Sequence, residues 1–336
     1  MKFYKILFSS MMVLGTLMAI SSYSWFSMWM GLEINLLSII PLMSSTKNML
    51  SSEATIKYFL TQTMASLILI FSIINMLLLN ENIAQVFDNM MMMTLNSSLL
   101  TKLGAAPFHF WFPEVMEGLS WLNCLILLTW QKIAPMILIM NNKMNNYFMI
   151  TIIVFSLMVS TLMGLNQTSL RKILSFSSIN HIAWMLSAQM ASHSIWLIYF
   201  LVYFLTNCMV IMLFQKTNIF YMKQLIMALS NNKKLKFTFM LNFFSLSGLP
   251  PFLGFLPKWL TINWLMLNNQ NMLSMFLILF TLIFMYIYTR IIFSALVIQI
   301  NESKIILNSQ MKWLLNFMNL FTMMSIFICT VMFNLF

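Results

Sequence analysis

Three lysines lie far from the ends of long apolar runs: Lys102, Lys132 and Lys258. A charged side chain at the centre of a membrane-spanning helix costs roughly 2.5 to 3.5 kcal/mol on insertion scales, so such residues usually face a bundle interior or a water-filled path and serve ions or protons. Glu33 is the only acid deep in an apolar run. Because a buried carboxylate is costly unless it is paired, we expect Glu33 to pair with Lys102. These residue types predict transport across a membrane.

Two of these lysines stand beside helix breakers. Lys102 precedes the run Gly104–Pro107, and Lys258 follows directly on the run Gly248–Pro257. Proline lacks a backbone donor and clashes with the preceding turn, so both helices are predicted to be interrupted there. Freed backbone groups at membrane depth are tolerated only inside protein or beside water. Broken helices with nearby charges recur at the ion sites of transporters.

Other polar residues in the apolar runs are weaker candidates. Lys132 with Pro135 repeats the arrangement in a milder form. His109 and His181 are candidate proton relays, because imidazole titrates near neutrality. His109 could equally cap unwound backbone, and His181 could hydrogen-bond to a facing helix. The alternative for all the lysines is that the prolines only shape packing and each ammonium reaches an interface.

Composition predicts an all-α polytopic membrane protein. Hydrophobic residues make up 61% of the chain and charged residues 7%, against about 45 to 50% and about 25% in soluble domains. Long apolar runs separated by short polar connectors predict eleven transmembrane helices. They are expected at residues 3–21, 24–44, 55–79, 89–110, 117–140, 147–165, 171–190, 194–215, 237–263, 271–298 and 313–335. Little sequence remains for loops, so residues 1–336 are predicted to form a single transmembrane domain.

The basic residues predict the orientation. With eleven spans, nearly all Lys and Arg of the loops and span ends fall on the side of the N-terminus, and the opposite side has only Lys143 with the acids Glu81 and Asp88. The positive-inside rule therefore places the N-terminus in the cytoplasm or mitochondrial matrix, and the C-terminus across the membrane. The net charge of +11 is then explained by short loops that touch anionic lipid headgroups, and nucleic acid is not expected as a partner.

The sequence offers no motif for a cofactor or metal. It contains no glycine-rich phosphate loop, no paired-cysteine motif and no two-histidine arrangement suited to haem. The three cysteines, Cys124, Cys208 and Cys329, lie within apolar runs and are interpreted as core residues. The energy for transport is therefore expected to come from other proteins.

Three segments carry a resemblance to a known family. Residues Lys102–Gly118, Ser177–Met185 and Ser245–Trp259 closely resemble the mitochondrially encoded, antiporter-like membrane subunits of respiratory complex I. The resemblance implies inverted five-helix repeats with two broken helices, shortened at the N-terminus. It also implies roles for four residues: Glu33 paired with Lys102, a central Lys132, and Lys258 in the second broken helix. The 37 methionines look like those of an A+T-rich animal mitochondrial gene, from an insect or other arthropod.

The same resemblance implies a function and its setting. The chain would be a core membrane-arm subunit of proton-pumping NADH:ubiquinone oxidoreductase in the mitochondrial inner membrane, with its N-terminus in the matrix and its C-terminus in the intermembrane space. NADH, FMN, iron-sulfur clusters and ubiquinone would bind other subunits. NADH dehydrogenase subunits 4L and 4, accessory subunits and phospholipids such as cardiolipin would be its neighbours. Two alternatives remain: a subunit of a related multisubunit cation/proton antiporter, and a membrane scaffold with no ion path.

Overall fold

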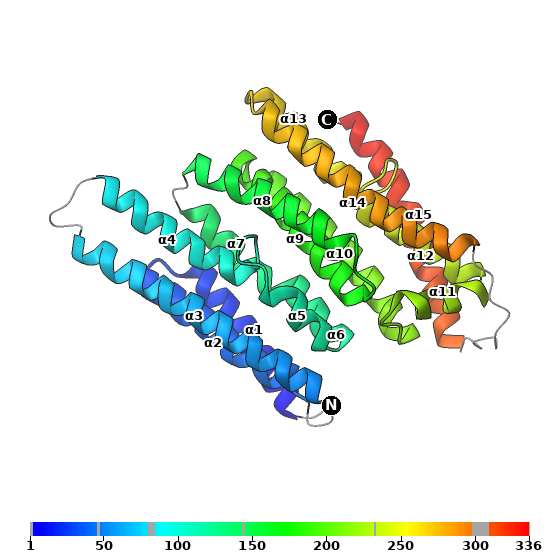
Figure 1. Cartoon of the computed structure of the whole chain (residues 1–336), viewed down its shortest axis with the longest axis horizontal. Coiled ribbons are helices and arrows are strands. Elements are labelled where there is room, and N and C mark those ends of the chain that lie inside the picture. Colours follow the sequence, from blue (N-terminus) through cyan, green and yellow to red (C-terminus); the bar gives the residue numbers. More distant parts are fainter. Residues whose placement is uncertain are drawn as a thin grey trace. The chain divides into compact units, whose positions relative to one another are not determined.

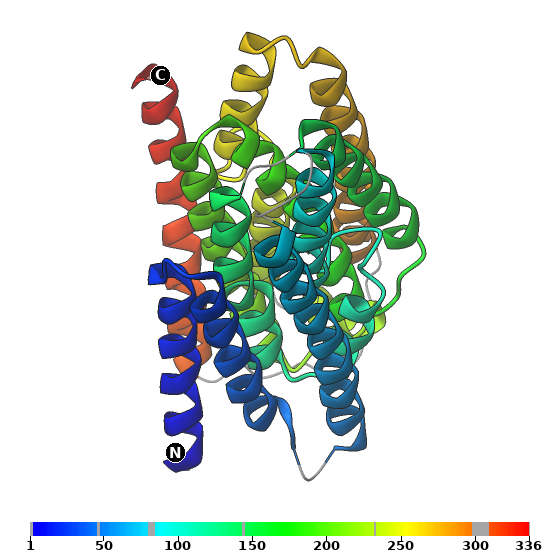
Figure 2. The same ribbon diagram turned by 90° about the vertical axis from the view of Figure 1, so that its left-hand side faces the viewer.

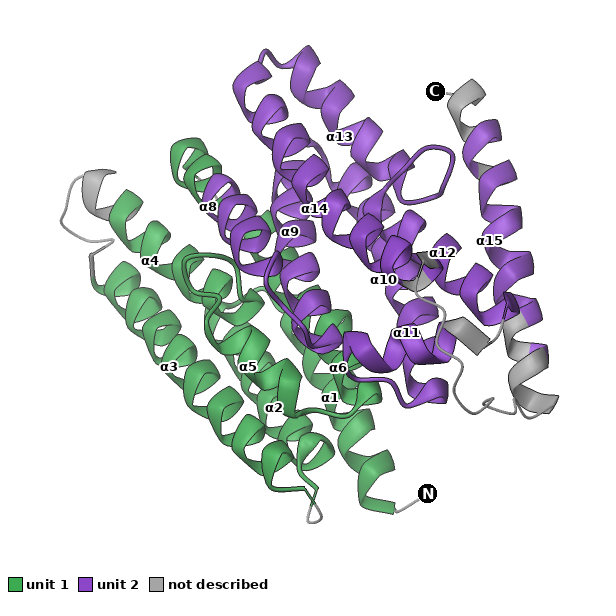
Figure 3. Ribbon diagram, turned by 45° about the vertical axis from the view of Figure 1, so that its right-hand side comes forward, with its two compact units in different colours: residues 1–152 green, residues 153–336 purple. Residues whose placement is uncertain are grey.

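The computed structural model describes residues 3–45, 48–79, 85–142, 145–231, 233–297 and 309–335. Within these ranges the named elements are all helices, α1 to α15 (Figure 1), which confirms the predicted all-α class. The chain forms two compact units, Met1–Ile152 and Ile153–Phe336, which Figure 3 colours separately. A single domain over residues 1–336 stays a prediction.

Unit 1 begins with a tightly packed helix pair. Its helices are α1 (Phe3–Ser21), α2 (Trp25–Met43), α3 (Met49–Leu79), α4 (Gln85–Leu103), α5 (Trp111–Gly118), α6 (Trp121–Leu128), α7 (Trp130–Asn141) and the start of α8 (Asn146–Gly164). The blue helices α1 and α2 lie side by side in Figures 1 and 2. A Cβ on Gly31 would lie 2.5 Å from the backbone nitrogen of Ala19, and one on Gly15 would lie 2.8 Å from that of Asn35. Small residues of this kind let membrane helices approach closely.

Unit 2 is organised around one inner helix. After the end of α8 it contains α9 (Leu170–Ala191), α10 (His193–Thr217), α11 (Met222–Asn231), α12 (Lys233–Ser247), α13 (Phe255–Leu267), α14 (Asn271–Val297) and α15 (Ser309–Leu335). Nearly every residue of α9 is buried, including Ser177, Ser178 and His181. It contacts α10, α13 and α14. Most of its polar side chains are therefore shielded by protein, and Arg171, Lys172 and Gln189 are half-buried.

Both predicted helix interruptions are present. In unit 1, α4 ends at Leu103 and α5 begins at Trp111. In unit 2, α12 ends at Ser247 and α13 begins at Phe255. Pro257, predicted to lie within the second interruption, is instead in the first turn of α13. A proline fits there because the amide it lacks has no acceptor within the helix.

The two interruptions are made by the same turn. Gly104 and Gly248 both have a φ of 76°, a conformation that glycine adopts without steric cost. The amide after each glycine reaches back to the last full turn, from Ala105 to the Leu100 carbonyl at 3.1 Å and from Leu249 to the Phe244 carbonyl at 3.3 Å. This is the Schellman ending of a helix.

Some predicted boundaries were wrong. The span expected at 117–140 begins at Trp121 and is itself interrupted at Thr129, between α6 and α7. Helix α11 was not predicted, although its inward residues Leu225, Ala228 and Leu229 follow helical spacing. That spacing was the available signal, but it covers too few residues for an apolar run.

Seven helical stretches in the described ranges are long and apolar enough to cross a membrane, with α6 and α7 counted together. The other four predicted spans correspond to α4, α9, α12 with α13, and α15, which are polar, interrupted or adjoin residues outside the described ranges. Eleven spans therefore remain a prediction. Among the charges used for the orientation, Glu81 and Lys143 and the Asp88 side chain lie outside the described residues.

Candidate functional site

All three predicted lysines are buried. The exposed fractions are 8% for Lys102, 1% for Lys132 and 8% for Lys258. Lys102 and Lys132 belong to unit 1, and Lys258 belongs to unit 2. Each of the three lies within one helical turn of an interruption: Lys102 before the end of α4, Lys132 after the start of α7 and Lys258 after the start of α13.

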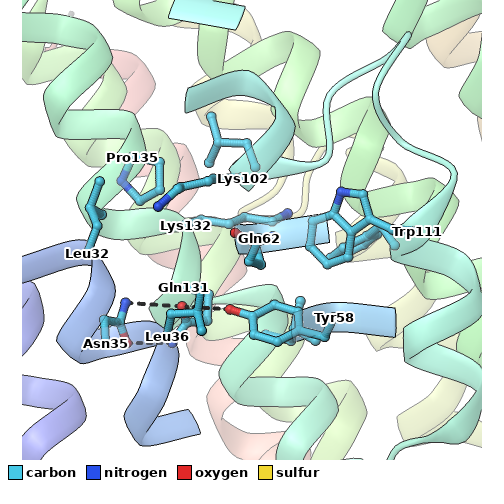
Figure 4. Close-up of a pocket in the computed structure, with 13 residues that line it drawn as sticks. Leu32, Asn35, Leu36, Tyr58, Gln62, Lys102, Trp111, Gln131, Lys132 and Pro135 are labelled. Atoms are coloured by element: carbon cyan, nitrogen blue, oxygen red, sulfur yellow. Dashed lines mark hydrogen bonds between the residues drawn. The ribbon is translucent and has the colours of Figure 1, made fainter. Parts of the chain in front are cut away.

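Lys102 and Lys132 line one cavity in unit 1. Figure 4 shows them entering it from α4 and α7. The cavity has a volume of ≈ 20 Å³, enough to hold a water molecule. Its polar lining is formed by Asn35, Tyr58, Gln62, Lys102, Gln131 and Lys132, and its apolar lining includes Leu32, Leu36, Trp111, Phe112 and Pro135. Two amines therefore share a small polar space inside an apolar bundle.

The interruption after α4 positions Lys102. This residue lies in the last turn of the helix. The Trp111 indole N–H donates to the Thr101 carbonyl at 3.0 Å, which ties the start of α5 back to that turn. The same indole packs against the Tyr58 ring with centroids 5.7 Å apart. Trp111 thus joins the start of α5 to α3 and to the turn of α4 that carries Lys102.

The expected direct pair of Glu33 and Lys102 is not formed. No ion pair shorter than 4 Å joins these two described residues, and Oε1 of Glu33 is buried without a hydrogen-bond partner. The reason is helix rotation: Leu32, Asn35 and Leu36 form the face of α2 that lines the cavity. Glu33 is turned away from it by about 100° relative to Leu32.

Lys132 stands in the first turn of α7, directly after the interruption at Thr129. Its Nζ lies 5.7 Å from the centroid of the Phe112 ring. An ammonium over an aromatic face is attracted by the ring quadrupole. The interruption at Thr129 lies on the N-terminal side of Lys132, whereas the sequence expectation rested on Pro135, which lies inside α7 on the other side of the lysine.

Lys258 in unit 2 has different partners. Its Nζ donates to the Ser247 carbonyl at 2.7 Å, at the C-terminal end of α12. It also lies 5.7 Å from the centroid of the Trp184 ring. A helix C-terminus carries partial negative charge and favours a cation. A Cβ on Gly248 would lie 2.7 Å from Nζ, so the glycine also leaves the space that the lysine occupies.

The two candidate histidines lie in different surroundings. His109 is buried in the loop between α4 and α5, and its Nδ1 has no hydrogen-bond partner. His181 forms a hydrogen bond between Nδ1 and the Tyr199 hydroxyl at 2.9 Å, which joins α9 to α10. His181 and Trp184 are one turn apart on α9 and so share a face. Neither histidine lines the cavity of unit 1.

The described part of the chain has no cluster of three or more His, Cys, Asp or Glu residues that would hold a metal ion. Cys124, Cys208 and Cys329 are not bridged.

Sequence reasoning missed several neutral polar residues at the site: Asn35, Tyr58, Gln62, Gln131, Trp184 and Tyr199. Asn35 and Gln131 are amides inside apolar runs, which was the available signal. It was weak because uncharged polar groups are common in helices that pack against one another in membranes.

Comparisons of the amino-acid sequence with known proteins all match the chain to one family. A family model described as NADH:quinone oxidoreductase/Mrp antiporter, TM, matches residues 22–284. NADH-ubiquinone oxidoreductase chain 2 of Anopheles gambiae is 49% identical over 298 residues, which covers 88% of this chain and 87% of that protein. The protein of the same name from Locusta migratoria is 43% identical over 335 residues, covering 98% and 97%.

Solved structures share the fold at low identity. A chain of respiratory complex I from Thermus thermophilus superposes with a TM-score of 0.85 at 20% identity, covering 98% of this chain and 78% of that one. A chain of the Mrp complex from Dietzia sp. superposes with a TM-score of 0.75 at 14% identity, covering 88% and 61%. These likenesses show an antiporter-like membrane fold.

Proposed function

The chain belongs to the family of NADH-ubiquinone oxidoreductase chain 2, the antiporter-like membrane-arm subunit of respiratory complex I, and we propose on this basis that it moves protons across the membrane. The carrying observation is the burial of two lysines, Lys102 and Lys258, that have no carboxylate partner among the described residues. Lys102 and Lys258 form no ion pair shorter than 4 Å within the described ranges. A buried ammonium without a salt bridge can release its proton more readily than a paired one.

Each proposed site residue has a role. The proton-carrying groups are Glu33, Lys102, Lys132 and Lys258, with His109 and His181 as relays. Lys102 and Lys132 exchange a proton through water in their shared cavity, and Glu33 lies on α2 next to the residues that line it. Lys258 takes up and releases a proton at the end of α12. The chain holds no redox centre in this proposal, and NADH, FMN, iron-sulfur clusters and ubiquinone act in other subunits of the complex.

The setting proposed is the mitochondrial inner membrane of an insect or other arthropod, with subunits 4L and 4, accessory subunits and cardiolipin as neighbours. We propose eleven spans built as inverted repeats and shortened at the N-terminus. The matched interruptions support the repeats, because Gly104 and Pro107 in unit 1 have the same spacing as Gly248 and Pro251 in unit 2.

The test is Lys132→Met in assembled complex I reconstituted into liposomes. The substitution keeps the side-chain volume and removes the titratable amine, so we expect fewer protons pumped per electron at an unchanged amount of complex. Lys216→Met is the matched control, because Lys216 is exposed at the end of α10. An unchanged proton-to-electron ratio in Lys132→Met would favour the membrane scaffold with no ion path.

We also predict the orientation. The N-terminus lies in the matrix and the C-terminus in the intermembrane space, because the number of spans is odd and the basic loops are on one side. Antibodies to each end, applied after protease treatment of mitoplasts, measure this. Loss of the N-terminal epitope with survival of the C-terminal one would show the opposite orientation.

A further inference from the structure

A reciprocal amide pair adjoins the lysines of unit 1. Gln131 Nε2 donates to Asn35 Oδ1 at 2.8 Å, and Asn35 Nδ2 donates to Gln131 Oε1 at 3.1 Å. The Tyr58 hydroxyl donates to the same Gln131 oxygen at 3.4 Å. Figure 4 shows this row of hydrogen bonds crossing the cavity below Lys102 and Lys132.

We propose that the Asn35–Gln131 pair is a positioning element that fixes Lys132 relative to Lys102 for proton exchange. Neither amide carries a proton itself. The pair joins α7, which carries Lys132, to α2, and so sets where the Lys132 amine enters the cavity. This inference rests on the proposed function and deepens it.

The backbone alone holds the first turn of α7 weakly. Thr129 has φ −116° and ψ −69°, outside the ideal helix. Pro135 has no amide hydrogen, so the Gln131 carbonyl lacks its usual donor four residues on. The Lys132 amide donates to the Thr129 carbonyl, three residues back, at 3.2 Å. This is the 3₁₀ pattern, in which the turn is tighter and the hydrogen-bond geometry poorer than in an α-helix. Side-chain contacts must therefore fix the orientation of this turn.

Helix α2 is a suitable anchor. Its backbone is in close contact with α1 at Gly15 and Gly31, where no side chain would fit. The anchor is also insensitive to charge, because neutral amides keep the same donors and acceptors whichever lysine is protonated. A carboxylate at Asn35 would instead strengthen and weaken its contacts as protons pass.

A second amide pair on the same helix provides a matched control. Asn142 Nδ2 donates to Asn96 Oδ1 at 2.9 Å and joins the end of α7 to α4. Both residues are buried. This pair is about 15 Å along the helix from Lys132, and neither residue lines the lysine cavity. It therefore supports α7 without positioning the amine.

The experiment compares the two pairs in assembled complex I. In Asn35→Leu with Gln131→Met, the two reciprocal hydrogen bonds are removed together. Only the Tyr58 hydroxyl loses its acceptor, in a long bond of 3.4 Å, so the complex should assemble. We expect the NADH:ubiquinone rate per assembled complex to fall about tenfold, since a misplacement of about 1 Å can cost up to about 100-fold. The pH dependence of the rate should also change. Asn96→Leu with Asn142→Leu should leave both unchanged.

The exchanged pair, Asn35→Gln with Gln131→Asn, conserves the reciprocal hydrogen bonds and should restore most of the rate, whereas each single exchange should not. A wild-type rate in the apolar pair would overturn the proposal. So would an equal loss in the Asn96 and Asn142 control, or an exchanged pair no better than its single variants. If Lys132→Met pumps normally, the proposed function itself fails; if Lys132→Met is impaired and the apolar pair is normal, only the positioning role fails.

Discussion

Lys102→Met lowers the NADH:ubiquinone rate of assembled complex I by about 100-fold, the low end of what a positioned proton-transfer group contributes. The physical reason is the loss of a titratable amine in a cavity of ≈ 20 Å³ that it shares with Lys132. Methionine has a similar volume, and because Lys102 forms no ion pair with a described carboxylate, its replacement leaves no salt-bridge partner uncompensated. The amount of assembled complex should therefore stay normal. The measurement is the rate and the proton-to-electron ratio in membranes, with the complex quantified on native gels.

Two further variants sharpen this prediction. Lys102→Arg should not restore pumping, because a guanidinium does not deprotonate in proteins. Glu33→Gln should act in the same direction but less strongly, since Glu33 forms no ion pair with Lys102 in the described part of the chain. Normal pumping in both Lys102→Met and Glu33→Gln would exclude a proton path through this cavity. The exposed Lys5 supplies the control substitution, Lys5→Met.

Lys258→Met is expected to abolish pumping through unit 2 and also to reduce assembly. The ammonium is hydrogen-bonded to the Ser247 carbonyl at 2.7 Å, so its removal strands a buried acceptor at the end of α12. Such a stranded group costs about 1 to 3 kcal/mol. The measurements are the proton-to-electron ratio and the quantity of assembled complex, compared with Lys216→Met.

Lys258→Gln separates the two effects. Glutamine keeps an N–H donor for the Ser247 carbonyl but has no titratable proton. We expect assembly to recover and the proton-to-electron ratio to stay low. A fully active Lys258→Gln complex would show that Lys258 is only a structural cap of α12.

The helix interruptions and the burial of the lysines could be predicted from sequence. Gly104, Gly248 and the prolines near them act on the backbone within one or two turns, so no distant contact is needed to end α4 or α12. Lys132 lies inside an apolar stretch long enough to span a membrane, Trp121–Asn141. Its burial follows from hydropathy, whereas Lys102 and Lys258 lie beside the interruptions of more polar helices.

The interruption at Thr129 and helix α11 were not predicted, for opposite reasons. Thr129 has no glycine or proline beside it, and the nearest proline, Pro135, lies inside α7. Helix α11 is short, and its amphipathic pattern is outweighed by the basic residues around it. Local signals of this size are ambiguous until the neighbouring helices are in place.

The sequence by itself determined which residues are buried charges and where the helices break, because both depend on hydropathy and on backbone chemistry close in the chain. Only the tertiary structure decided which residue of α2 faces Lys102. A change of one residue turns a helix by about 100°, and in a membrane the apolar pattern runs all round the helix and does not fix its rotation. The close contact of Gly15 and Gly31 between α1 and α2 fixes it instead. That contact directs Asn35 into the cavity and leaves Glu33 beside it.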